Sequence, residues 1–259
     1  WDLIYYNNYT ADNGASAPPE MSVGDVGESA SRLSRASYFG SIEFVDEGVG
    51  VVLDALKDAN VYDDMLIIFI SDHGDMNGDH FMWRKGYPYN GAAKVPGMIK
   101  WPEKMEDVGV KKGDVLTQVL ELRDVAPTIW DVSGILANVT KDDPLVNGES
   151  WLPLLRDGTA VIREVIDLEH NQGGGGPMHW SALTDGKIKY AYYPDDGREL
   201  LFDMEADPEE SFNLSGKEEW ADVLELWRGR MVEQFNSEGR GDEWVDVVSG
   251  ELMLRGSIT

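Results

Sequence analysis

The sequence has 259 residues, of which 42% are hydrophobic, and this suits one large domain or one and a half. Its formal net charge is −26, which argues against a nucleic-acid-binding protein because such proteins present basic patches. No run approaches the ~18 apolar residues that a membrane helix needs, so we expect no membrane span. The acidity is typical of a solvated surface, and it opposes long-range capture of an anionic polymer unless the site itself is locally positive.

The first part of the chain, residues 1–35, is rich in Asn, Gly, Ser, Ala and Pro and predicts an extended connector. The chain opens at Trp1 without an initiator Met or a signal-peptide pattern, so we expect an upstream part. Apolar residues then recur at helical spacing and predict a helix over 36–57.

An apolar run over 65–70 follows, with no polar alternation. Such a run predicts a strand covered on both faces, as in a parallel sheet, and a helix followed by a buried strand is typical of a βαβ-type unit. Further strands are predicted over 95–101 and 115–120. Asp124 is expected to cap a helix that Gly134 ends.

The second half has a different pattern. Strand signals over 161–168, 179–184, 188–193 and 199–203, with Asp185-Gly186 as a hairpin turn, predict a small antiparallel sheet. Ser215 and Glu218 have the spacing of a capping box, and the apolar face of the helix that follows is expected to pack on that sheet. The predicted fold class is α/β: residues 36–145 form part of a mainly parallel sheet flanked by helices, and residues 146–259 form a small antiparallel sheet with a packed C-terminal helix and an acidic tail.

The most informative stretch lies where the 65–70 strand ends. Asp72 and His73 occupy the point at which ligands bind in open α/β sheets, just beyond the carboxyl end of a strand. A carboxylate and a neutral imidazole together suit a hard cation. Lys85 follows past two glycines, so its ammonium can face an anionic substrate. The same turn is also explained by ordinary loop chemistry, with Asp72 bonding the next amides.

The string from Ser71 to Pro96 closely resembles the sulfatase family of the alkaline-phosphatase superfamily. Collinear motifs extend the resemblance over most of the chain, from about residue 37 to 235; they lie at 121–128, 147–155, 169–170, 189–190 and 201–214. The resemblance is to the C-terminal half of a sulfatase. The first half of such proteins carries two metal-binding aspartates and a Cys or Ser that becomes formylglycine, the nucleophile. This chain has no cysteine, and its nearest match has Glu20 where Arg is needed.

The resemblance implies a role for each matching residue. Asp72 and His73 would complete a divalent-cation site, most simply Ca²⁺, with aspartates from the missing half, and Lys85 would bind the sulfate as a catalytic cation. Residues that could contact substrate, with ordinary packing as the alternative, are His80, Trp83, Arg84, Tyr87 and His170. The sequence departs from the family at Asn90, where Glu is usual, and at Lys94, where Arg is usual.

These residues imply a sulfuric-ester hydrolase acting on a sulfated carbohydrate or an aryl sulfate, with the N-terminal half of the same protein as its partner. Two alternatives stay open: a phosphodiester or phosphonate hydrolase of the same superfamily, and a non-catalytic protein that holds calcium. Sequons at Asn8, Asn138 and Asn213 permit glycosylation, in keeping with a secreted or extracytoplasmic protein.

Overall fold

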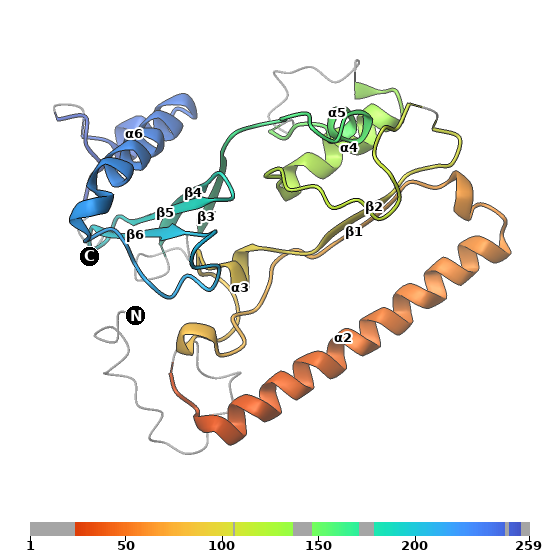
Figure 1. Cartoon of the computed structure of the whole chain (residues 1–259), viewed down its shortest axis with the longest axis horizontal. Helices are drawn as coiled ribbons and strands as arrows, with labels where there is room; N and C mark the ends of the chain where they lie inside the picture. The colour runs from red at the N-terminus through yellow and green to blue at the C-terminus, as the bar shows by residue number, and fades with distance from the viewer. Residues whose placement is uncertain (1–23, 106, 137–146, 171–178, 247–248, 255–259) are drawn as a thin grey trace. The chain divides into compact units, whose positions relative to one another are not determined.

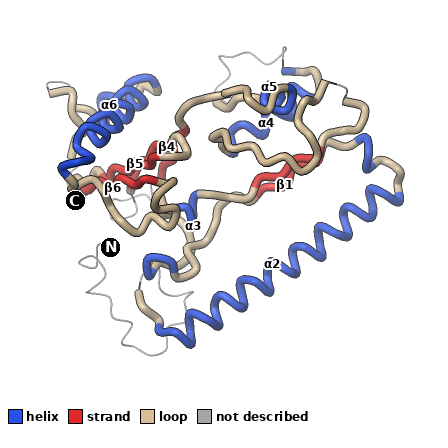
Figure 2. Tube along the Cα trace, viewed as in Figure 1, coloured by secondary structure: helices blue, strands red, loops and turns tan. Residues whose placement is uncertain are grey.

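The computed structural model describes residues 24–105, 107–136, 147–170, 179–246 and 249–254 (Figures 1 and 2). The chain divides into two compact units, residues 1–106 and 107–259. The connector predicted over 1–35 and the subdomain boundary predicted near residue 145 lie mostly or wholly outside the described residues, so this division of the chain stays a prediction.

The first described helix of the first unit is a long one, α2, over Gly27–Asp58, and the helix predicted over 36–57 lies entirely within it. Residues 27–35, which were predicted as part of the extended connector, are helical too, so that prediction is wrong for this segment. Figure 2 shows it as a single uninterrupted rod. None of its residues is buried, although its sequence carries several large apolar side chains. Phe39 is 60% exposed and Phe44 76% exposed. Exposed apolar surface of this kind is typical of a helix face that packs against another element.

Two short strands follow α2 in the same unit. Strand β1 (Ile67–Ile70) pairs with β2 (Gly97–Lys100), from Ile67 opposite Lys100 to Ile70 opposite Gly97. Both strands were predicted, but their pairing is antiparallel, and β2 is the only partner of β1 among the described residues. The expected parallel sheet is therefore not confirmed. The reason is physical: a continuous apolar run indicates that both faces of a strand are to be covered, but it does not specify the direction of the neighbouring strand.

The second unit starts with a loop where the sequence predicted a strand over 115–120. Val115 is 87% exposed, and the segment has no ladder partner in the described part of the chain. Two short helices follow, α4 (Val125–Val132), preceded by a 3₁₀ turn over Leu122–Asp124, and α5 (Leu152–Arg156). Gly134 follows the end of α4 in the left-handed region, as predicted.

Four strands then form an antiparallel sheet in the order β3-β4-β5-β6. Their bounds are Ile166–His170, Trp180–Thr184, Ile188–Tyr193 and Arg198–Asp203. Helix α6 (Ala221–Ser237) packs on this sheet, and a short helix, α7 (Gly241–Trp244), follows it. The shared core includes Tyr190 and Leu201 of the sheet with Trp227 and Phe235 of α6. The predicted antiparallel sheet and its packed helix are confirmed.

A second local prediction in this unit, besides the strand over 115–120, is also wrong. Ser215 does not cap the helix; its hydroxyl donates to the carbonyl of Glu199 at 2.9 Å, and its amide donates to Asn213. A 3₁₀ turn over Glu218–Trp220 leads into α6 instead. The Ser215 hydroxyl thus bonds the Glu199 carbonyl of the sheet, whereas the capping pattern predicted a bond to a helix amide. None of the described helices is both long and apolar enough to cross a membrane.

Candidate active site

The candidate site begins where β1 ends. The hydroxyl of Ser71 donates to the carbonyl of His73 at 2.7 Å, and the amide of His73 donates to Asp72 Oδ1 at 3.0 Å. Loss of some water around Asp72 would raise its carboxyl pKa, but the hydrogen bond from the His73 amide and the positive charge of Lys85 lower it below its ordinary value. The turn thus keeps Asp72 ionised, as a cation ligand must be.

Lys85 returns to this turn from the far side of the loop. Its Nζ lies 2.8 Å from His73 Nε2, and Asp72 Oδ2 lies 3.3 Å from the same nitrogen. His73 Nδ1 lies 2.8 Å from the carbonyl of Gly74. Because a carbonyl can only accept, we assign the proton to Nδ1, which leaves the Nε2 lone pair facing Asp72 and Lys85. This is the tautomer that a metal-ligating histidine needs.

Gly74 locks the turn against the next helix, α3 (Asn90–Ala93). Its amide donates to the carbonyl of Ala92 at 2.8 Å. A Cβ at Gly74 would lie 2.1 Å from the carbonyl oxygen of Gly91. Glycine is required here for close backbone approach, because no side chain fits between the two segments.

The loop that carries Lys85 is packed rather than free. Trp83 is 3% exposed, its ring lies against Gly78, and its Nε1 donates to the carbonyl of Gly24 at 3.2 Å. The ring of His80 stacks on Tyr89 with 4.3 Å between centroids. Trp83 and His80 therefore shape the loop in this structure, and their predicted contacts with substrate stay predictions.

The other three residues predicted to contact substrate lie differently. Tyr87 is buried, at 5% exposure. Arg84 is exposed next to Lys85, with a left-handed φ of 67°. His170 ends β3 in the second unit, where its ring stacks on Trp180 with 6.2 Å between centroids. The structure therefore brings Asp72, His73 and Lys85 together, whereas His170 belongs to a separate unit.

Asp72 and His73 could supply two ligands of a metal site, which is fewer than a complete site has. Asp72 offers a carboxylate whose side chain is 83% exposed, and His73 offers a nitrogen beside it. Oxygen and imidazole donors suit a divalent cation. In the part of the chain that the structure describes, no group of three or more His, Cys, Asp or Glu side chains could hold a metal. A cation bound at Asp72 and His73 would need further ligands.

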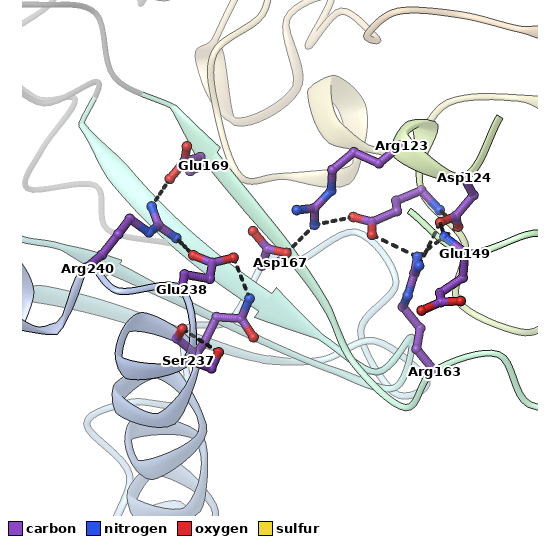
Figure 3. A network of polar contacts seen from close by, with 11 residues as sticks. Arg123, Asp124, Glu149, Arg163, Asp167, Glu169, Ser237, Glu238 and Arg240 are labelled. Atoms are coloured by element: carbon purple, nitrogen blue, oxygen red, sulfur yellow. Dashed lines mark hydrogen bonds and ion pairs between the residues drawn. The ribbon is translucent and has the colours of Figure 1, made fainter. Parts of the chain in front are cut away.

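A second polar region lies in the second unit, around a cavity of about 700 Å³ lined by β3, α6 and the turn before α4 (Figure 3). Arg123 lies between Glu121 and Asp167, and Arg240 lies between Glu169 and Glu238. Burial raises the pKa of Glu121, although the Arg123 guanidinium opposes this.

Asp124 anchors this network and is fully buried. Arg163 binds it with two hydrogen bonds, at 2.8 and 2.6 Å. Three further donors reach the same carboxylate, namely the amides of Glu121 and Glu149 and the indole of Trp151. Sequence reasoning expected a helix cap at Asp124 and missed this buried ion pair. The guanidinium groups are occupied by carboxylates of the same unit, so the network has the character of a structural support.

Comparison with known proteins places these residues in a family. The family model described as Sulfatase matches residues 5–135, and the model described as N-sulphoglucosamine sulphohydrolase, C-terminal, matches residues 78–237. An arylsulfatase of Clostridium perfringens is 34% identical over 233 residues, which cover 90% of this chain and 45% of that protein. A choline-sulfatase of Rhizobium meliloti is 38% identical over 191 residues, covering 74% of this chain and 35% of that protein.

A solved structure extends the likeness to the fold. The phosphonate monoester hydrolase of Silicibacter pomeroyi superposes with a TM-score of 0.70 at 25% identity, covering 94% of this chain and 50% of that one. The chain thus spans half or less of the length of each of these relatives.

Proposed function

The chain belongs to the sulfatase family, and we propose that it supplies part of the metal and sulfate site of a sulfuric-ester hydrolase. The observation that carries the proposal is the meeting of Lys85, His73 and Asp72 at the end of β1. Two candidate metal ligands on one turn, with the Lys85 ammonium beside them from the far side of the loop, suit a sulfate ester better than a neutral substrate.

Each residue has a distinct role in this proposal. Asp72 and His73 would hold a divalent cation, proposed to be Ca²⁺, and a bound cation of this kind polarises a sulfate-ester oxygen. The Lys85 ammonium would bind the sulfate and offset the charge that develops on the leaving oxygen. The turn keeps Asp72 ionised, and the Gly74 carbonyl keeps the His73 proton on Nδ1.

The remaining ligands and the formylglycine nucleophile are proposed to lie on a part of the protein outside this chain. Two features of the first unit support this. Helix α2 has no buried residue, and Met98 of β2 is 59% exposed. A two-stranded sheet is marginal by itself, so we propose that the missing part adds parallel neighbours to β1 and covers the apolar face of α2.

The main competing function is phosphonate or phosphodiester hydrolysis, since a metal with a lysine also suits phosphate. It has support in the fold likeness to a phosphonate monoester hydrolase. The curated sulfatase relatives are more similar in sequence, at 34% and 38% identity against 25%. We therefore place sulfate esters first.

The test uses the full-length protein with an aryl sulfate and a phenyl phosphonate as parallel substrates. Asp72→Asn is expected to weaken calcium binding and sulfatase turnover together. Lys85→Ala is expected to leave calcium affinity unchanged and to lower turnover by about 10²–10³-fold, the cost of removing one preorganised charge contact. The matched control is Lys104→Ala, which removes an exposed lysine paired with Asp64.

Two results would contradict the proposal. Faster hydrolysis of the phosphonate than of the sulfate would favour the competing function. Full turnover in Lys85→Ala, equal to that of Lys104→Ala, would mean that the Lys85 ammonium does not act on the substrate.

A further inference from the structure

The loop between Asp75 and Gly86 holds an unfavourable backbone conformation just before Lys85. Arg84 has a φ of 67°, and side chains with a Cβ rarely adopt this region. Asn77 and His80 on the same loop also have positive φ, at 49° and 54°. A conformation of this kind persists only where neighbouring groups hold it in place.

The carboxylate of Asp75 is one of those groups. Its Oδ1 accepts a hydrogen bond from the amide of Asn77 at 2.7 Å, which is a local turn contact. The same oxygen also accepts from the amide of Arg84 at 3.2 Å, across nine residues of chain. The carbonyl of Arg84 is held separately, by the amide of Met76 at 2.8 Å. Both backbone polar groups of Arg84 are therefore fixed by residues 75 and 76.

Fixing Arg84 also fixes the start of Lys85. A lysine side chain has four rotatable bonds, so its ammonium reaches one position reliably only if its backbone is already in place. In this structure that ammonium lies 2.8 Å from His73 Nε2. Asp75 thus connects the two ends of the loop: it follows His73 in the turn and holds the amide of Arg84, the residue before Lys85.

We propose that Asp75 is a positioning residue for Lys85. The proposal rests on the proposed sulfatase function, and it adds a residue that touches neither substrate nor metal in the roles assigned above. Asp75 acts through its acceptor oxygen, by holding the Arg84 amide. A purely structural role would instead affect the fold as a whole, whether or not Lys85 is present.

The experiment is a double-mutant cycle in the full-length protein, measured with an aryl sulfate. Asp75→Ala is expected to lower kcat by about 10- to 100-fold, the cost of a small misplacement of a catalytic group. In a Lys85→Ala background the same change is expected to alter kcat by less than about 2-fold, because the group being positioned is gone.

Two further variants separate positioning from folding. Asp75→Asn keeps an acceptor oxygen in the same place and is expected to restore most of the kcat that Asp75→Ala loses. Asp79→Ala is the matched control, since Asp79 is a carboxylate on the same loop that pairs with Arg35 and bonds no backbone amide of Arg84. Its kcat is expected to stay close to that of the unmodified protein.

Amide hydrogen exchange gives a measurement that needs no activity. The Arg84 amide is expected to be protected in the unmodified protein and in Asp75→Asn, and to exchange faster in Asp75→Ala. An unprotected Arg84 amide in the unmodified protein would overturn the proposal. Equal losses of kcat in the two backgrounds would also overturn it while leaving the sulfatase function standing, whereas an unmodified protein with no activity on sulfate esters would refute the proposed function itself.

Discussion

Replacing Asp124 with Asn tests how much of the second unit depends on one buried carboxylate. The substitution keeps the shape of the side chain and removes its charge beside Arg163, whose side chain is only 15% exposed. Removing one partner of a buried ion pair costs about 3–5 kcal/mol, because the other charge is left uncompensated. Glu121 still reaches Arg163 Nη1 at 2.8 Å and offsets part of this, so we expect about 3 kcal/mol.

The assay is urea unfolding of the full-length protein, followed by circular dichroism. With m-values of about 1–3 kcal/mol per molar urea, a loss of about 3 kcal/mol lowers the midpoint by about 1–3 M. The control is Glu169→Gln, which breaks the pair with Arg240 at a site where the Glu169 side chain is 57% exposed. A partly exposed pair of this kind is worth about 0–1 kcal/mol. A midpoint for Asp124→Asn no lower than that of Glu169→Gln would refute the reasoning.

Three further changes test separate parts of the molecule. Gly74→Ala places a methyl group against the Gly91 carbonyl and is expected to lower both calcium affinity and kcat, the latter by about 100-fold. The control is Gly40→Ala, at a position with open space around it. Equal effects of the two substitutions would contradict the close-approach argument. Asn213→Ala removes a side-chain amide that bonds three backbone groups, and it should lower the free energy of unfolding in urea by about 2–4 kcal/mol. Because that amide is occupied, peptide mapping after secretion from a eukaryotic host should find Asn213 unglycosylated. Burial would raise the pKa of Glu199, but hydrogen bonds from Arg228 and Tyr190 lower that pKa below its ordinary value. The contribution of Glu199 to stability is therefore complete above the unfolded-state pKa of about 4.3, and it is lost as the pH falls through the lower, folded-state pKa. Glu199→Gln should flatten that acid limb below about pH 4.3, and unfolding curves that stay parallel to those of the unmodified protein would count against it.

The parts of the fold that could be predicted from sequence are those whose pattern and partners lie close together in the chain. Strands β4, β5 and β6 follow one another with short turns, so alternation and turn residues were sufficient to find them. The apolar face of α6 was equally clear, because its partner sheet immediately precedes it. Helix α2 was found from its periodicity alone.

The parts that could not be predicted depend on distant or absent partners. The apolar run of β1 indicated burial, but the direction of its neighbour is not encoded in that run. Ser215 was assigned to a helix cap because a local pattern matched, while the Glu199 carbonyl, 16 residues away, determined its actual bond. Asp124 does stand at the N-cap position of α4, but its carboxylate makes no cap bond to that helix, and nothing near it in sequence points to Arg163, 39 residues later.

The candidate site shows the same division. The sequence predicted that the Lys85 loop would fold back toward the turn of Asp72 and His73, and in the structure the Lys85 ammonium lies 2.8 Å from His73 Nε2. The supporting contacts were not foreseen, because Asp75 acts on a backbone amide and Gly74 acts through the absence of a side chain. Residue patterns indicate which side chains carry chemistry, whereas the groups that hold them in place are often backbone atoms.

The exposure pattern within the first unit bears on how the proposed site would keep its geometry. The residues that shape the loop are buried, with Met76 at 1% and Trp83 at 3% exposure, whereas the Asp72 side chain is 83% exposed. An ionised carboxylate is costly to bury without a compensating charge, so it has to stay in water until a cation and further ligands reach it. Under the proposed function, packing of the loop would fix the positions of Asp72 and His73, and the bound cation would neutralise their charge. Under the proposed function, this separates folding of the loop from assembly of the metal site, so that the turn at Asp72 forms before the cation binds.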